Sequence, residues 1–187
     1  SHIREVDAII HLVRCFESEK ITHVNSNINP VEDLETIKTE IILSDLDIVQ
    51  KKLEKGKKKL LQEKEVKILE EKLHELNDGK EIVTNSEFEK KFLTSLGLLS
   101  IKPKIIVCNV DEESLVKGNN FTENVKKKYS NEKIVTICAD IEDQIMGLDN
   151  NERETFMKEI GLNKTGLNKL IKEGYDLLNL DTFFTSG

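Results

Sequence analysis

The sequence contains little cysteine, and its cysteines are poorly placed for cross-linking. Cys15, Cys108 and Cys138 are odd in number, far apart along the chain, and each lies in an apolar run. This pattern argues against a disulfide framework and against a zinc site, whose cysteines occur at short, regular spacings. It fits the reducing environment of the cytoplasm, where we expect the protein to be located.

Long apolar runs and a signal sequence are also missing. A membrane-spanning helix needs roughly 20 apolar residues, and no run in the sequence approaches this length. The first residues, Ser1–Glu5, do not match a signal peptide either, so we expect neither export nor a membrane partner. The chain has no initiator methionine and starts and stops beside strand-like runs, so we expect a fragment of a larger protein.

An excess of positive charge is absent as well. The formal net charge is -7, which gives no general attraction to phosphate groups, so nucleic-acid binding would depend on a local basic patch. Charged residues make up 34% and hydrophobic residues 37% of the chain, which is more charge than is usual in a single compact domain. We therefore expect part of the chain to be solvated helix.

Three short apolar runs rich in β-branched residues predict a parallel sheet. They are continuous rather than alternating, as is typical of strands buried on both faces. Each is followed by polar residues and then a helical pattern, as in βαβ units, whereas an antiparallel sandwich would show alternation and hairpin turns. The predicted fold class is α/β, a partial doubly wound domain. The runs are Ala8–Val13, Ile105–Cys108 and Ile134–Cys138.

A charged helical insertion separates the first two runs. It begins at Asn29-Pro30, where proline suits the first turn of a helix. Two sets of apolar residues then recur at spacings of three and four, and two antiparallel helices with a narrow coiled-coil seam explain both. The sets are Ile42, Leu46, Val49, Leu53 and Val66, Leu69, Leu73, Leu76. A short helix around Phe88–Leu96, stopped by Gly97, leads back to the sheet.

The last third of the chain contains three further helical patterns. They cover Phe121–Tyr129, Asp149–Ile160 and Thr165–Leu178. The final run, Thr182–Thr185, is typical of a strand that starts a further unit.

The tetrapeptide Asn109-Val110-Asp111-Glu112 follows the second buried run. Ligands bind at the carboxyl ends of strands in open parallel sheets, so base recognition is expected here. The guanine-reading motif of GTPases is Asn-Lys-x-Asp, and this chain has Val110 in place of lysine and Glu112 in place of aspartate. Strict guanine recognition is therefore not expected. An ordinary turn or helix cap would use the same residue types and stays an alternative.

A second polar segment, Cys138-Ala139-Asp140, ends the third run. A small residue here lets backbone N–H groups approach the edge of a base, while Asp140 is expected to be the N-cap of the following helix. Because parallel strands end at the same edge of a sheet, the two segments should line one ligand-binding crevice.

A set of short motifs covers nearly the whole chain and is highly specific as a group. It consists of Ile3–Ile9, Val13–Glu17, His23-Val24, Asn29-Pro30, Ser44–Asp47, Leu99–Pro103, Asn109–Glu112, Gly166–Asn168 and Gly174–Gly187. By these motifs the chain resembles the YchF, or Obg-like, ATPases, which are GTPase-fold proteins that associate with ribosomes. The match is weakest in residues 55–97.

The resemblance implies a nucleotide-hydrolysing switch protein that prefers ATP to GTP. It implies that Asn109, Val110 and Glu112 surround the base and that Cys138 and Ala139 form the other wall. It also implies three regions. Residues 1–31 and 98–180 would be the C-terminal half of a nucleotide-binding G-type domain, residues 32–97 a helical coiled-coil insertion, and residues 181–187 the start of a TGS-like domain.

The resemblance assigns a tentative catalytic role to His23, because a histidine on a loop is thought to assist hydrolysis in this family. A neutral imidazole there could position water or stabilise phosphoryl charge. A solvated surface histidine is the alternative that the sequence alone favours.

The chain departs from the family in having no Gly-x-x-x-x-Gly-Lys-Ser/Thr loop and no Asp-x-x-Gly segment. These motifs supply the phosphate cradle and the Mg2+ ligands, so we expect phosphate and Mg2+ to be bound by an upstream part and this chain alone to be inactive. Gly161–Gly166 has the glycine spacing of a phosphate loop, but it lies between helices rather than after a strand. We interpret it as a chance match.

Lysines gather toward the tip of the helical insertion. Such a cluster could contact phosphates of ribosomal RNA, although interleaved glutamates are equally typical of a solvated coiled-coil surface. A second hypothesis is therefore an RNA-, ribosome- or protein-binding module that acts through this arm, with hydrolysis secondary. The cluster comprises Lys51, Lys52, Lys55, Lys57, Lys58, Lys59 and Lys64.

Overall fold

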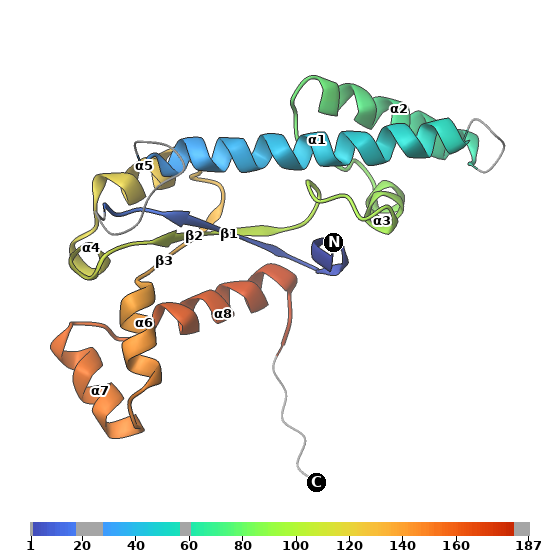
Figure 1. The fold of residues 1–187 in the computed structure, drawn as a ribbon. Helices are drawn as coiled ribbons and strands as arrows, with labels where there is room; N and C mark the ends of the chain where they lie inside the picture. The colour runs from blue at the N-terminus through green and yellow to red at the C-terminus, as the bar shows by residue number, and fades with distance from the viewer. Residues whose placement is uncertain (1, 18–27, 57–60, 182–187) are drawn as a thin grey trace, which may run out of the picture. The chain divides into compact units, whose positions relative to one another are not determined.

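The computed structural model of the chain describes residues 2–17, 28–56 and 61–181. The chain divides into two compact units. One unit consists of residues 8–34 and 103–187 and is called here the sheet unit. The other consists of residues 1–7 and 35–102 and is called the helical unit. Figure 1 shows the elements of both.

The sheet unit contains three parallel strands, β1 (Ile9–Arg14), β2 (Lys104–Asn109) and β3 (Lys133–Ile137). They pair in the order β1-β2-β3. Val13 lies opposite Cys108, which in turn lies opposite Thr136. The three predicted runs thus form the strands, and the predicted α/β class with a parallel sheet is confirmed.

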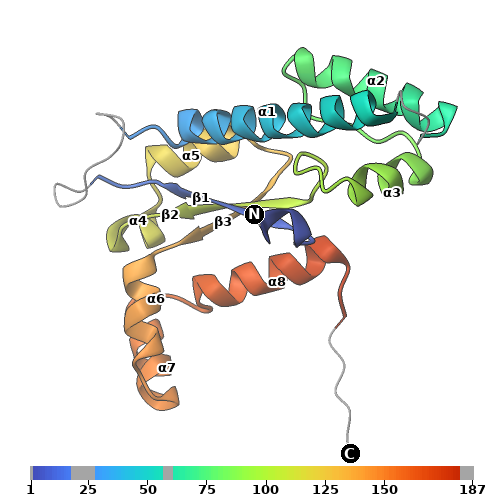
Figure 2. The same cartoon turned by 45° about the vertical axis from the view of Figure 1, so that its right-hand side comes forward.

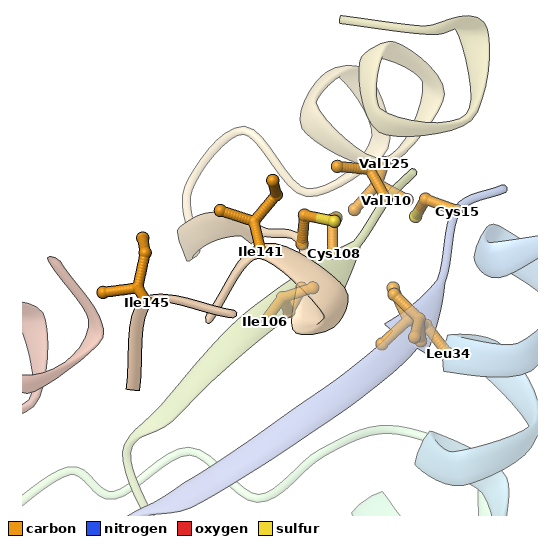
Figure 3. Packing of buried hydrophobic residues seen from close by; sticks show 10 residues of the cluster. Cys15, Leu34, Ile106, Cys108, Val110, Val125, Ile141 and Ile145 are labelled. Carbon is orange, nitrogen blue, oxygen red and sulfur yellow. The ribbon is translucent and has the colours of Figure 1, made fainter. Parts of the chain in front are cut away.

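Helices follow β2 and β3 in the sheet unit. They are α4 (Glu112–Lys117), α5 (Asn120–Lys128), α6 (Ala139–Met146), α7 (Asn150–Glu159) and α8 (Gly166–Leu178). Ile106 and Cys108 share a core with Val125 of α5, as Figure 3 shows. Ile105 and Val107, which point to the opposite face of β2, pack with Leu170 of α8.

The strand β1 corrects one expectation. Its burial alternates, and Ile10 and Leu12 are 54% and 61% exposed, so the prediction of a strand buried on both faces is wrong for β1. The register places Ile10 beside Ile105 on one face of the sheet. On this face, the side chains of α8 pack with β2 and β3. Within the part of the chain that the structure describes, Ile10 and Leu12 of β1 therefore stay exposed.

The helical unit is built from a short 3-10 helix, η1 (His2–Glu5), and three α-helices. These are α1 (Pro30–Gly56), whose first turn belongs to the sheet unit, α2 (Glu63–Asn77) and α3 (Glu87–Ser95). In Figures 1 and 2, α2 runs back beside α1. The two predicted sets of apolar residues all lie in one core with Leu93 and Leu98. That the pair forms a coiled coil stays a prediction.

A buried carboxylate fixes the irregular segments of the helical unit to α1. Asp45 is fully buried, and it accepts hydrogen bonds from the backbone N–H groups of Leu99 at 2.9 Å and Ser100 at 2.8 Å. Arg4 Nη1 lies 3.5 Å from Asp45 Oδ1 and donates to the carbonyl oxygen of Gly97 at 2.9 Å. Residues near the start of the chain and residues after α3 are thereby held against one helix.

A buried ammonium group on α2 binds the segment that follows this helix in a similar way. Lys72 Nζ lies 2.8 Å from Glu89 Oε1 and 2.9 Å from Glu75 Oε1, and it donates to the carbonyl oxygen of Val83 at 2.7 Å. Burial opposes the charged form, but the hydrogen bonds to Glu89 and Glu75 outweigh it and raise the pKa of Lys72 above its ordinary value of 10.5. The lysine is therefore charged at neutral pH.

Candidate nucleotide-base site

The carboxyl ends of the three strands meet at one edge of the sheet. Arg14 lies opposite Asn109, and Asn109 lies opposite Ile137. The residues that follow each strand therefore come together, as the sequence predicts for the two polar segments. In doubly wound folds such an edge is where ligands bind.

Asn109 connects all three strand ends. Its carbonyl oxygen accepts a hydrogen bond from the backbone N–H of Cys15 at 2.7 Å. Its side-chain Oδ1 accepts from the backbone N–H of Ala139 at 3.0 Å. Next to it, the N–H of Val110 donates to the carbonyl oxygen of Ile137 at 2.8 Å. The structure thus brings the loop after β2 into direct contact with the loop after β3.

Val110 lies in the core rather than at the surface. Its side chain is only 2% exposed and packs in the cluster that also contains Cys15, Val125 and Ile141 (Figure 3). A ligand at this edge could meet the backbone of Val110, but the side chain serves packing. The position explains why an apolar residue occupies it.

The two acidic residues after Val110 have different roles. Asp111 is the N-cap of α4, and its Oδ1 accepts a hydrogen bond from the backbone N–H of Ser114 at 2.7 Å, so the helix-cap alternative holds for Asp111. Glu112 is exposed in the first turn of α4. Its Oε1 accepts a hydrogen bond from Nε2 of Gln144 on α6 at 3.1 Å.

Gln144 is a residue that the sequence analysis missed. It lies 32 positions from Glu112, and its place on α6 follows from the burial of Ile141 and Ile145 on the same helix. Nothing in the spacing of residues along the chain signals this contact, because it depends on how α4 and α6 sit at the sheet edge.

Cys138 and Ala139 mark the start of α6. Cys138 is buried and is the N-cap residue, so α6 begins at Ala139 and Asp140 lies in its first turn. The expectation that Asp140 is the N-cap is therefore wrong by two positions, because β3 ends at Ile137. Burial raises the pKa of the Cys138 thiol, and the nearby carboxylates of Asp140 and Glu112 act in the same direction. The thiol stays neutral at physiological pH.

The remaining cysteines lie beneath this edge. Cys15 and Cys108 are free thiols in the same core cluster as Cys138. A hydrogen bond with Cys108, together with burial, raises the pKa of Cys15 well above its ordinary value. The same hydrogen bond lowers the pKa of Cys108. Cys15 therefore acts as a small neutral core residue.

The segment Gly161–Gly166 does not form a phosphate cradle. At the start of α8, the carboxylate of Glu142 accepts hydrogen bonds from the backbone N–H groups of Gly166 at 2.6 Å and Leu167 at 3.2 Å. Thr165 caps the helix by accepting from the N–H of Asn168 at 3.0 Å. A carboxylate of the chain itself thus occupies the place where a phosphate would have to bind.

Several predicted residues lie outside the described residues or belong to the helical unit. His23 and Lys57–Lys59 are outside the described residues. Lys51 and Lys55 are exposed on the last turns of α1 in the helical unit, Lys52 is partly exposed, and Lys51 pairs with Asp47 at 2.6 Å.

The described ranges contain neither a metal-ligand cluster nor a membrane-spanning helix. Within 2–17, 28–56 and 61–181, no three histidine, cysteine, aspartate or glutamate residues gather as metal ligands would. None of the helices described is both long and apolar enough to span a membrane.

Comparisons with known proteins place these observations in a family. No protein-family model matches the chain. It is 37% identical over 199 residues to the "Ribosome-binding ATPase YchF" of Bacillus subtilis, and 39% identical over 198 residues to the protein of the same name from Escherichia coli O157:H7. Each alignment covers 100% of this chain and 54% of the relative, so the chain spans about half the length of these curated relatives.

A solved structure agrees with the sequence relatives. The YchF GTPase of Schizosaccharomyces pombe superimposes with a TM-score of 0.87 at 28% sequence identity, covering 100% of this chain and 54% of that one. The sequence and the fold therefore lead to the same conclusion, that this chain is similar over its whole length to about half of a YchF protein.

Proposed function

We propose that this chain is the base-recognising part of a nucleotide-hydrolysing switch protein that prefers ATP to GTP. The contact that supports the proposal most directly is the hydrogen bond from the backbone N–H of Ala139 to Asn109 Oδ1 at 3.0 Å, because it joins the two expected walls of the base site. The relatives' names, which include ATPase and GTPase, support the same class of activity.

In this proposal Asn109 and Glu112 read the base edge. The side chain of Glu112 is exposed beside the strand ends, and a carboxylate accepts hydrogen bonds from exocyclic amino groups. Ala139, Cys138 and the backbone of Val110 form the walls on which the base lies. Arg14 at the end of β1 donates to the carbonyl oxygen of Phe16 at 3.0 Å, and the residues Asn109–Glu112 and Cys138–Asp140 are neutral or acidic, so these two segments suit a base better than a phosphate group.

The phosphate chemistry belongs to a part that this chain does not contain. Mg2+ and a phosphate loop would be supplied upstream, with His23 positioning water for attack on the terminal phosphate. Residues 1–31 and 98–180 are proposed as half of the G-type domain and residues 181–187 as the start of a TGS-like domain. Such a protein would work in the cytoplasm, where ribosomes and ATP are available.

The experiment that tests the base site compares nucleotide binding by this chain with binding by the chain extended upstream through a phosphate loop. ATP and GTP are titrated in the presence of Mg2+. We expect tight ATP binding by the extended chain alone. Binding by neither protein, or a clear preference for GTP, would contradict the proposal.

Two adjacent glutamates provide a matched control. Glu112→Ala in the extended protein should weaken ATP binding about tenfold, equivalent to the loss of one hydrogen bond to a charged group. Glu113→Ala should leave binding unchanged, because the exposed side chain of Glu113 pairs with Lys117 of the same helix at 2.8 Å. His23→Ala should reduce hydrolysis and leave ATP affinity unchanged.

The helical arm offers a second candidate function, ribosome association through its basic tip. The name "ribosome-binding" of the relatives and the exposure of Lys51 and Lys55 at the end of α1 support it. In this proposal α1 and α2 (residues 32–97 with α3) form a coiled-coil arm. Reversing the charge of Lys57–Lys59 should then reduce co-sedimentation with ribosomes. The other lysine triplet, Lys126–Lys128 on α5, is the control and should have no effect.

A further inference from the structure

The contact between Gln144 and Glu112 extends the proposed base site and rests on it. Gln144 Nε2 donates to Glu112 Oε1 at 3.1 Å. Both side chains are exposed, but their helices are fixed. Asp111 caps α4 through Ser114, and Ile141 and Ile145 anchor α6 in the core. The fold therefore presents these two side chains to each other at the end of the sheet that the base would approach.

The carboxylate of Glu112 lies near the end of β3 as well as beside Gln144. Its charge acts on the buried thiol of Cys138 and contributes to the raised pKa of that thiol. Cys138 immediately precedes Ala139, whose N–H binds Asn109. The loop after β2 is therefore joined to α6 at two points, by Asn109 with Ala139 and by Glu112 with Gln144.

The hydrogen bond has a consequence for base selection. Guanine presents two parallel donors, its ring N1–H and its 2-amino group, which suit a carboxylate that accepts with both oxygens. Adenine presents one exocyclic amino donor on its equivalent edge. Because Gln144 already donates to Oε1, Glu112 offers Oε2 as its main acceptor, which matches the single donor of adenine better than the pair on guanine.

We propose that Gln144 is a specificity-determining residue, which engages one oxygen of Glu112 and so favours adenine over guanine. The residue acts through Glu112 and is a positioning residue rather than a catalytic one. Its hydrogen bond is solvent-exposed, whereas α4 and α6 are held by their own cap and core contacts. The hydrogen bond between Gln144 and Glu112 therefore contributes little to the stability of the fold.

The test measures the affinities of fluorescent ATP and GTP analogues for the protein that includes the upstream phosphate loop. Gln144→Met keeps the length of the side chain and removes the donor. We expect the ratio of the GTP to the ATP dissociation constant to fall about threefold to tenfold, chiefly through tighter GTP binding. Gln144→Lys, which restores a donor toward Glu112, should return the ratio close to its original value.

Two further variants separate failure of this inference from failure of the base site. If Gln144→Met leaves the ratio unchanged while Glu112→Ala alters it, Gln144 has no role in selection and the base site stands. If Glu112→Ala also leaves both affinities unchanged, the base site itself is wrong. In the double variant, Gln144→Met should add nothing to Glu112→Ala, and an additive effect would overturn the proposed action through Glu112.

Discussion

The sheet unit and the helical unit hold their chain segments in place by different interactions. In the sheet unit, backbone ladders fix the strands, and the core beside them contains Ile106, Cys108 and Val125. In the helical unit, the described segments between the helices contain no such ladder, and the buried charges of Asp45 and Lys72 bind backbone groups of these segments instead. In the helical unit, irregular segments are therefore held against the helices by charged side chains. We expect this unit to be more sensitive than the sheet unit to substitution of a single polar residue.

The largest expected effect is at Lys72. Lys72→Met keeps the volume but leaves Glu89 and Glu75 without their cation, and breaking a buried pair in this way costs about 3–5 kcal/mol. The free energy of unfolding, measured by urea titration with circular dichroism, should fall by that amount. Lys67→Met is the control, because Lys67 and Glu63 form an exposed pair worth less than about 1 kcal/mol. Equal losses of unfolding free energy in the two variants would contradict the expected difference between a buried and an exposed ion pair.

The next effect is at Asp45. Asp45→Asn replaces one acceptor oxygen by an NH2 group that faces a backbone N–H, so that one of Leu99 and Ser100 loses its partner. We expect a loss of about 2–3 kcal/mol. Asp47→Asn, two residues along the same helix, removes only an exposed pair with Lys51 and should be close to neutral. A neutral Asp45→Asn would show that the buried carboxylate does not hold this segment.

In the sheet unit, Gly166 is a position at which space rather than charge limits substitution. A Cβ at Gly166 would lie 2.6 Å from Ile137 Cγ2 and 2.9 Å from Glu142 Oε1, so Gly166→Ala should cost about 1–2 kcal/mol. Gly174 is on the same helix and would meet nothing within 4 Å. Gly174→Ala should therefore stabilise the chain by about 0.5–1 kcal/mol. Opposite signs for the two variants in thermal melts are the expected result.

The smallest effect is on the pH dependence of stability. The pKa of Lys72 is higher in the folded chain than its ordinary value of 10.5, so its contribution is complete below that value and is lost as the pH rises through the folded pKa. The difference in unfolding free energy between the original chain and Lys72→Met should therefore shrink as the pH rises above 10.5. A difference that stays constant would mean that the ion pair does not contribute.

Much of the fold could be predicted from the sequence, because it depends on local patterns. The β-branched runs became the strands, and the apolar sets of the insertion share one core. The exposure of Ile10 and Leu12 could not be predicted, because an apolar run shows that a strand can be buried and not what covers it. The meeting of the loops after β2 and β3 followed from parallel topology, whereas the contact between Gln144 and Glu112 depends on tertiary packing.

The hydrogen bond between Arg4 and the segment after α3 has a consequence for the order of folding. Paired residues of β1 and β2 are about 95 positions apart along the chain, and closing a loop of this length costs more entropy than closing the shorter one between β2 and β3. Arg4 and Gly97, 93 positions apart, are hydrogen bonded within the helical unit. If the helical unit folds first, it has already closed most of that loop, and β1 can pair with β2 by a short search rather than a long one.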